Sequence, residues 1–249
     1  MCSSDLPNDR GCIVTKPSAI SADPRYQPLY TIAEVARFAR ANRSTLRTWV
    51  VGRTHPYKPK EHYPPVLKAA DQSRQDMLSF MNLIETHVLI ALRTIHRVPL
   101  HKVRAAVDWL RRETGLSHPF AELAIETDGR DLFARFLGRL FSASERGQAV
   151  MPELVERFLR RVKRDAQGLP ELFFPFTRSE VGSECPMDIV INPAVVFGRP
   201  VIFGTRISTA VIFERYTARE SIIDIATDYN VDPRPVEEAL RCEIEKRAA

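Results

Sequence analysis

Cysteine pairs, long hydrophobic runs and a signal peptide are all lacking in this sequence of 249 residues, and each absence excludes a class of protein. The four cysteines are scattered and form no C-x-x-C pair, which argues against a disulfide framework and against a zinc site of the usual spacing. No apolar run approaches the roughly 18–20 residues that span a bilayer. The N-terminus also lacks the apolar core of a signal peptide. We therefore expect a cytoplasmic protein with no membrane association.

Signals of catalysis are missing as well. The sequence has no G-K-S/T phosphate loop, no nucleophile–base motif and no cluster of metal-ligand residues. His55 and His62 could be metal ligands, but no partner cysteine or carboxylate pair accompanies them. We expect no enzymatic activity, no cofactor and no metal.

Positive charge is what the sequence does have, and it is concentrated. Residues 30–68 contain eight basic and two acidic side chains, a net charge of +6, whereas the whole chain carries +5. The rest of the chain is therefore close to neutral. A local basic patch of this kind is typical of a surface that binds the phosphates of nucleic acid.

Residues 30–50 within this patch predict a helix, a tight turn and a second helix. Thr31 and Glu34 have the spacing of a capping box at the first helix start, and Asn42 can cap a second helix from Arg43 to about Val51. The inward positions of the second helix are apolar and its outward positions are basic or hydroxylic, as in a recognition helix. An αα-hairpin that binds no nucleic acid has the same apolar pattern. The basic charge favours DNA binding.

The next stretch, residues 52–65, is basic and aromatic, and its glycine and prolines exclude a long helix. We expect a short hairpin there, a wing, that carries cations to the phosphates. The predicted DNA-binding residues are Arg43, Ser44, Thr45, Arg47, Thr48, Arg53, Lys58 and Lys60.

Two further helices are predicted after the wing, over residues 71–96 and 100–112. With the sequence Asn42 to Trp49, this order of elements resembles the DNA-binding domain of MerR-type winged-helix regulators. The resemblance covers about 85 residues and implies operator binding by a homodimer. Two features depart from it: Arg40 stands where those proteins usually have glycine in the turn, and their long dimerising coiled coil is absent.

The middle of the chain, residues 115–186, has a different character. An Asp-Gly pair at residues 128–129 is a hairpin signal between predicted strands over 121–126 and 131–136. A helix over 152–165 and an edge strand over 172–176 are predicted to follow. Such a segment can form a dimer interface or a platform between domains.

The C-terminal residues 187–249 predict a strand over 189–191, a hairpin-like stretch over 197–207 and three helices over 208–216, 221–229 and 232–245. Gly198 and Gly204 are expected to supply positive φ in turns, and Asn230 to end the second of these helices. Without a G-K-S/T sequence, the two glycines do not indicate a phosphate loop.

The block from Gly198 to Ile207, GRPVIFGTRI, closely resembles the family catalogued as domain of unknown function 433. The resemblance spans about 60 residues. Members are similar to antitoxins of the VapB type, which implies a partner: a ribonuclease toxin with a PIN-like fold.

Charge separates the two ends of the chain. The last two helices could form a second DNA-binding helix–turn–helix, but residues 207–249 carry six basic and nine acidic side chains, a net charge of −3. A phosphate backbone repels such a surface, whereas a basic protein site attracts it. We expect the toxin to contact Arg199, Arg206, Glu237, Glu238 and Arg241.

The sequence therefore predicts a mainly α protein with small β elements, an α+β fold. The expected regions are a flexible arm (1–29), a winged helix–turn–helix domain (30–114), a middle segment (115–186) and an antitoxin-type module (187–249). The expected function is an antitoxin that neutralises its toxin and represses its own operon. A stand-alone MerR-like transcription regulator, with the C-terminal module used only for dimerisation, is the alternative.

Overall fold

A helix–turn–helix stands near the start of the described chain. The computed structural model describes residues 23–55, 58–71, 73, 76–96, 99–122, 160–178 and 186–244. After the short helix η1 (Pro24–Tyr26) and the strand β1 (Tyr30–Thr31) come α1 (Ile32–Phe38) and α2 (Arg43–Val51). The expected capping box is present between Thr31 and Glu34, and the Asn42 side chain accepts hydrogen bonds from two amides of α2. The sequence prediction of both helix starts is confirmed.

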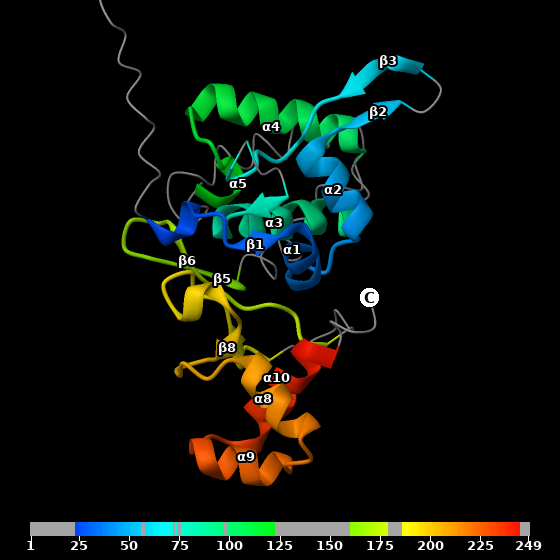
Figure 1. Ribbon diagram of the computed structural model, residues 1–249. Helices are drawn as coiled ribbons and strands as arrows, with labels where there is room; N and C mark the ends of the chain where they lie inside the picture. The colour runs from blue at the N-terminus through cyan, green and yellow to red at the C-terminus, as the bar shows by residue number, and fades with distance from the viewer. Residues whose placement is uncertain are drawn as a thin grey trace, which may run out of the picture.

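The expected wing follows directly. Strands β2 (Arg53–His55) and β3 (Lys58–Tyr63) pair antiparallel and project from the body beyond α2 (Figure 1). Gly52 caps the end of α2, where its amide donates to the carbonyl of Thr48. Its φ of +85° then turns the chain into the first strand of the wing. A side chain is excluded at Gly52, since a Cβ would lie 2.7 Å from the carbonyl oxygen of Tyr63.

The helices that support this pair are α3 (Phe80–His96), α4 (Leu100–Thr114) and the short α5 (Pro119–Glu122). The predicted start of α3 at residue 71 is wrong. Residues 77–78 instead form β4 (Met77–Leu78), which pairs antiparallel with β1. Ser79 and Asn82 then cap α3 reciprocally, each side chain accepting a hydrogen bond from the amide of the other. The apolar residues 77 and 78 are used for strand pairing, a long-range interaction that the helical period could not reveal.

Residues 160–173 of the middle segment form a β-hairpin rather than a helix. Strands β5 (Val162–Arg164) and β6 (Pro170–Phe173) pair antiparallel, so the predicted helix over 152–165 is wrong for residues 160–165, while residues 152–159 lie outside the described chain. The predicted strand over 172–176 is confirmed only at its first two residues. The predicted 121–136 hairpin is wrong at residues 121–122, which lie in α5, and its remainder is outside the described residues.

The C-terminal module follows its prediction closely. Strand β7 (Ile189–Val190) pairs antiparallel with β8 (Val201–Ile202), and η2 (Val196–Gly198) lies between them. Helices α8 (Thr209–Thr217), α9 (Ile222–Tyr229) and α10 (Pro233–Ile244) follow. Gly198, Gly204 and Asn230 all have positive φ, as expected. The fold is therefore mainly α with small antiparallel strand pairs, as the sequence predicts.

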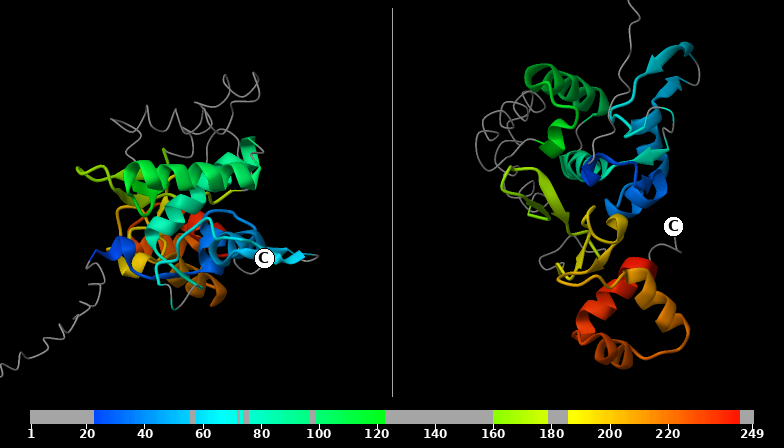
Figure 2. Two further views of the ribbon diagram at one scale, coloured as in Figure 1. Left: turned by 90° about the horizontal axis from the view of Figure 1, so that it is seen from above. Right: turned by 60° about the vertical axis from the view of Figure 1, so that its left-hand side comes forward.

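Figures 1 and 2 show α1–α5 at one end of the molecule, α8–α10 at the other and β5–β8 between them. The end of strand β6 links the two ends of the molecule. Phe173, its last residue, belongs to the apolar core of α1–α5, whereas the next residue, Phe174, packs with Val190 of β7 and Val201 of β8. A further core joins α8, α9 and α10 around Ile212, Ile225 and Val236.

Candidate nucleic-acid interface

The candidate recognition face is the outer side of α2. Leu46, Trp49 and Val50 are buried against the core, as their helical spacing predicts. The same spacing leaves Arg43, Ser44 and Arg47 exposed and Thr45 and Thr48 half-buried. The structure therefore brings all five predicted α2 residues onto the part of the helix that the core leaves uncovered.

On this face Ser44 and Thr48 have hydrogen-bond partners for their hydroxyl groups, whereas the guanidinium groups lack ion-pair partners among the described residues. Ser44 donates to the Asn42 side chain at 2.7 Å, and Thr48 donates to the carbonyl of Ser44 at 3.0 Å, so both hydroxyls already have local partners. Arg43 and Arg47 have no ion-pair partner among the residues that the structure describes. Unpaired guanidinium groups are the ones that can engage phosphate or the guanine edge without first breaking an internal ion pair.

The wing is held at a fixed position relative to this face. The amides of Val66 and Leu67, where the wing returns to the body, both donate to the carbonyl of Trp49. Arg104 of α4 supports the same return, because it donates to the carbonyl of Pro64 and lies over the ring of Tyr63. Lys58 and Lys60 belong to β3. Exposed Arg53 starts β2 and therefore adds a cation next to α2.

Arg40, the residue that departs from the MerR-like pattern, has a local explanation in the structure. It adopts the left-handed conformation, with φ at +54°, in the turn between α1 and α2. This conformation costs a non-glycine residue about 1–2 kcal/mol. The Arg40 Nε group donates to the carbonyl of Phe176 at 3.0 Å, which offsets part of that cost and ties the turn to the middle segment.

The five residues predicted to contact a toxin are not equivalent in the structure. Arg206 is exposed, and the side chains of Glu237 and Arg241 are about half exposed on α10. Arg199 is also half exposed, but it forms an ion pair with Glu34 of α1. Arg206 is therefore open to a partner, whereas Glu237 and Arg241 lie 4.0 Å apart as an ion pair on the exposed side of α10.

Glu238 requires a correction, because its carboxylate is buried rather than presented on the surface. It accepts hydrogen bonds from the Thr177 hydroxyl and from Nε of Arg178 at 3.0 Å, and it also lies 3.5 Å from Nε of Arg241. Thr177 and Arg178 follow the β5–β6 hairpin, sixty residues before Glu238 in the chain. No local sequence signal predicts this pairing, which fastens α10 to the middle segment.

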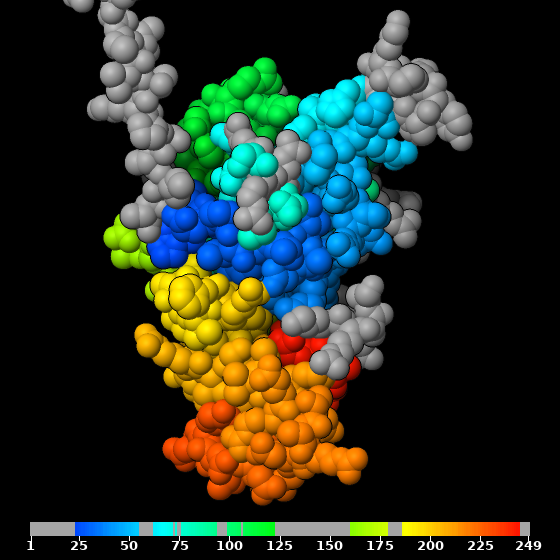
Figure 3. All heavy atoms as spheres, in the orientation of Figure 1, coloured from blue at the N-terminus to red at the C-terminus, as the bar shows by residue number. Residues whose placement is uncertain are grey.

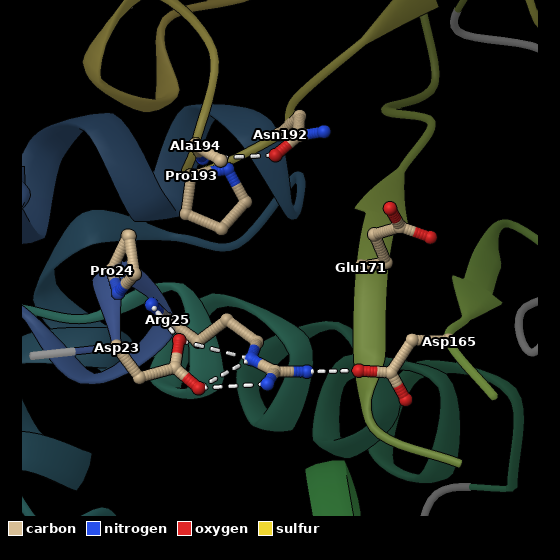
Figure 4. A pocket seen from close by; sticks show the side chains of 8 residues that line it. All are labelled: Asp23, Pro24, Arg25, Asp165, Glu171, Asn192, Pro193 and Ala194. Atoms are coloured by element: carbon tan, nitrogen blue, oxygen red, sulfur yellow. Dashed lines mark hydrogen bonds and ion pairs between the residues drawn. The ribbon is translucent and has the colours of Figure 1, made fainter. Parts of the chain in front are cut away.

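A hollow of about 240 Å³ lies between η1, the β5–β6 hairpin and the turn after β7 (Figure 4). Its centre is Arg25, which bridges Asp23 and Asp165 through ion pairs at 2.7 and 2.5 Å. The remaining oxygen of Asp165 accepts two backbone amides of the hairpin turn. These charges satisfy one another, so the hollow is a structural junction and not a candidate ligand site.

A buried ion pair lies deeper, between α3 and α5. His118 Nδ1 is 2.8 Å from a carboxylate oxygen of Glu85, which is fully buried. Burial lowers the pKa of His118, but the Glu85 carboxylate outweighs this effect and holds the pKa above its ordinary value. The pair is closed off from solvent and therefore stabilises the helices instead of forming a catalytic site. No group of three potential metal ligands occurs in the described parts of the chain.

Two family models match separate parts of the chain. Residues 28–107 match the family model described as "Putative DNA-binding HTH domain", and residues 189–241 match "Protein of unknown function (DUF433)". The first match contains α1, α2 and the wing, and the second contains β7, β8 and most of the three C-terminal helices. Among the described residues, no helix is long and apolar enough to cross a membrane.

Similar proteins cover nearly the whole chain. The "Putative antitoxin VapB45" of Mycobacterium tuberculosis is 28% identical over 229 residues, which are 86% of this chain and 92% of that protein. "Uncharacterized protein Rv2308" of the same organism is 28% identical over 85% of this chain and 88% of its own length. The crystal structure of Rv2018 from M. tuberculosis superposes with a TM-score of 0.63 at 26% identity, covering 86% of this chain and 98% of the other.

Proposed function

We propose that this protein is a non-enzymatic antitoxin that represses its own operon. In this proposal a homodimer binds operator DNA through α2 and the wing, and the C-terminal module holds a ribonuclease toxin with a PIN-like fold. The observation that carries the DNA-binding half is the group of exposed arginines, Arg43, Arg47 and Arg53, that lack ion-pair partners in the described structure. The match to the DNA-binding family model and the similarity to the antitoxin support the same conclusion.

The mechanism of DNA binding follows from the geometry. Arg43 and Arg47 lie one helical turn apart on α2, so both can enter one major groove while Arg53 reaches a flanking phosphate. Two copies related by a two-fold axis then place their α2 helices in successive major grooves, about 34 Å apart. We expect a footprint with two half-sites separated by about one helical turn of DNA.

The toxin-binding half rests on the open, acidic surface of the C-terminal module. Glu237 is exposed on α10 and Glu214 is exposed on α8, whereas a ribonuclease site that binds RNA phosphates is basic. Complementary charge attracts such a partner to this end of the molecule and not to α2. Arg206, Glu237 and Arg241 are the residues that we assign to this contact.

Two reciprocal variants test the proposal. Arg47→Ala should weaken binding to the DNA upstream of the protein's own reading frame by about 1–3 kcal/mol, roughly 5- to 150-fold, and leave toxin binding unchanged. Glu237→Lys should leave DNA binding within about threefold and weaken capture of the small protein encoded beside this one. DNA affinity is measured by gel shift and toxin capture by co-purification. Unchanged DNA affinity in Arg47→Ala would refute the assignment of α2, and failure to capture the neighbouring protein would favour a stand-alone regulator.

A further inference from the structure

Helix α1 is joined to the C-terminal module by two ion pairs between residues that are far apart in the sequence. The first is between Arg37 in α1 and Glu243 in α10, whose Nη1 and Oε2 atoms lie 3.3 Å apart. Only 15% of the Arg37 side chain and 5% of the Glu243 side chain are exposed. The other oxygen of Glu243 accepts the hydroxyl of Thr209 at 2.7 Å, so one buried carboxylate connects α1, α8 and α10.

The second ion pair is between Glu34 in the first turn of α1 and Arg199, just after η2. Glu34 belongs to the capping box, where it accepts the amide of Thr31 at 2.9 Å. Arg199 binds the other carboxylate oxygen of the same side chain. Arg199 thus holds the group that starts α1, and Figure 3 shows the blue surface of α1 bordering the yellow surface around η2.

Two backbone contacts reinforce these ion pairs. The hydroxyl of Tyr30, which is fully buried, donates to the carbonyl of Gly198 at 3.1 Å. Arg40, at the far end of α1, donates to the carbonyl of Phe176. Helix α1 is therefore held at its start, on its side and at its end by residues that come more than a hundred positions later in the sequence.

None of these contacts uses the outer face of α2. These four hydrogen bonds reach α1 and its flanks from residues 176–243, and α2 follows α1 through a turn of only four residues. In a helix–turn–helix the first helix crosses the DNA backbone and the second enters the groove, so the orientation of α1 sets that of α2. The C-terminal module thus grips the helix that orients the recognition helix and leaves the recognition face open.

We infer that the C-terminal module is a positioning element for DNA binding, and that Arg37 and Glu243 are positioning residues that hold α1, and through it α2, in the orientation that fits DNA. This inference rests on the proposed DNA-binding function of α2. It assigns to the C-terminal module an indirect role in operator recognition, exerted through α1.

The inference is tested by whether DNA affinity rises or falls when the charge of Glu243 is removed. Glu243→Gln keeps the size of the side chain and its acceptor for Thr209 but removes the charge that faces Arg37. If the charge acted only through its field, its loss would strengthen DNA binding, because DNA is an anion. If Glu243 positions α1, its loss weakens binding roughly three- to tenfold. The slope of log affinity against log salt stays unchanged, because no phosphate contact is lost.

Asp232→Asn is the matched control, because Asp232 lies directly before the same helix, is exposed and has no described contact with α1. It removes the same charge, and we expect DNA affinity to stay at or slightly above that of the native protein. Affinity is measured on the DNA upstream of the reading frame at several salt concentrations. Unchanged or stronger binding by Glu243→Gln overturns the inference. The exchanged pair Arg37→Glu with Glu243→Arg should recover affinity relative to Arg37→Glu alone, and no recovery counts against positioning.

A measurement without DNA separates this inference from the proposed function. Amide hydrogen exchange over residues 32–51 should be faster in Glu243→Gln than in Asp232→Asn, because α1 has lost one of its anchors. Equal exchange in the two variants overturns the inference whether or not the native protein binds DNA. If exchange differs but the native protein does not bind the upstream DNA, the anchoring of α1 by Glu243 is supported and the proposed DNA-binding function is refuted.

Discussion

The exposed arginines of α2 and several arginines of the C-terminal module have different surroundings. On α2 and at the start of the wing, Arg43, Arg47 and Arg53 point outward with no ion-pair partner among the described residues. In the C-terminal module, Arg215 binds two carboxylates and stacks on the ring of Tyr229, and Arg234 lies 3.1 Å from Asp188. The residue type is the same at both ends, but its surroundings differ.

This contrast supports the assignment of α2 and the wing as the DNA-binding end, although Arg206 of the C-terminal module is exposed as well. An arginine that is already paired must lose its partner before it can bind a phosphate, and that loss offsets the gain. Unpaired arginines on a rigid helix avoid this cost. Arg37 and Arg199 form a third group of arginines. Each is ion-paired with a carboxylate from the other end of the molecule, and we assign them to holding α1 in place rather than to binding a ligand.

The largest effect that we expect comes from disturbing the contact between the two ends at Gly198. Its φ is +71°, and a Cβ there would lie 2.2 Å from the hydroxyl oxygen of buried Tyr30. Gly198→Ala should therefore lower the free energy of unfolding by roughly 2–4 kcal/mol, through backbone strain and overpacking together. Urea denaturation followed by tryptophan fluorescence measures the loss.

Gly204→Ala is the control for backbone strain. Its φ is +78°, but nothing lies within 4 Å of the position that its Cβ would take. We expect a loss of about 1 kcal/mol, from the left-handed conformation alone. Equal losses in the two alanine variants would show that the close contact with Tyr30 contributes nothing to stability.

The parts of the fold that could be predicted are those encoded by neighbouring residues. The Thr31–Glu34 capping box, the Asn42 cap and the serine caps of α8 and α9 are all local signals, and the structure has each helix start within a residue of its prediction. The recognition face follows from the same local period. Local signals also gave the wing, because glycine and prolines leave few alternatives to a hairpin.

The parts that could not be predicted depend on partners distant in the sequence. Residues 77–78 and 162–164 have apolar patterns compatible with a helix, but pairing with β1 and β6 makes them strands. The sequence predicts Glu238 as a surface acid on α10, but in the structure its carboxylate is buried and binds Thr177 and Arg178. The joint between Arg37 and Glu243 spans 206 positions, and no spacing rule connects residues so far apart.

A smaller, pH-dependent effect is expected from the buried pair of His118 and Glu85. Because the pKa of His118 is raised in the folded protein, the protonated form stabilises the fold below the ordinary histidine pKa of about 6.5. That contribution is lost as the pH rises through the raised pKa. The free energy of unfolding should therefore fall between slightly acid and slightly alkaline pH, in the N-terminal part of the chain.

Replacement of the titrating group tests this prediction. In His118→Gln the amide can still donate to Glu85 but cannot titrate, so the variant should lose most of the pH dependence. His101→Gln, at an exposed position of α4, should keep it. Urea midpoints measured at intervals from pH 5.5 to about 8.5 decide the matter, and parallel profiles for His118→Gln and the native protein would exclude His118 as the source.

The smallest net effect is expected at Arg40, where two opposing contributions nearly cancel. Arg40→Gly relieves the left-handed strain of about 1 kcal/mol but loses the hydrogen bond to the carbonyl of Phe176, so stability should change by less than about 0.5 kcal/mol. Arg40→Ala keeps the strain and loses the bond, so it should be less stable than Arg40→Gly by about 1 kcal/mol. Equal urea midpoints for the two variants would mean that the φ of residue 40 relaxes without the arginine. In that case the turn would require neither glycine nor the arginine hydrogen bond at position 40. A difference in the expected direction shows instead that arginine replaces glycine here because the turn is tied to the middle segment.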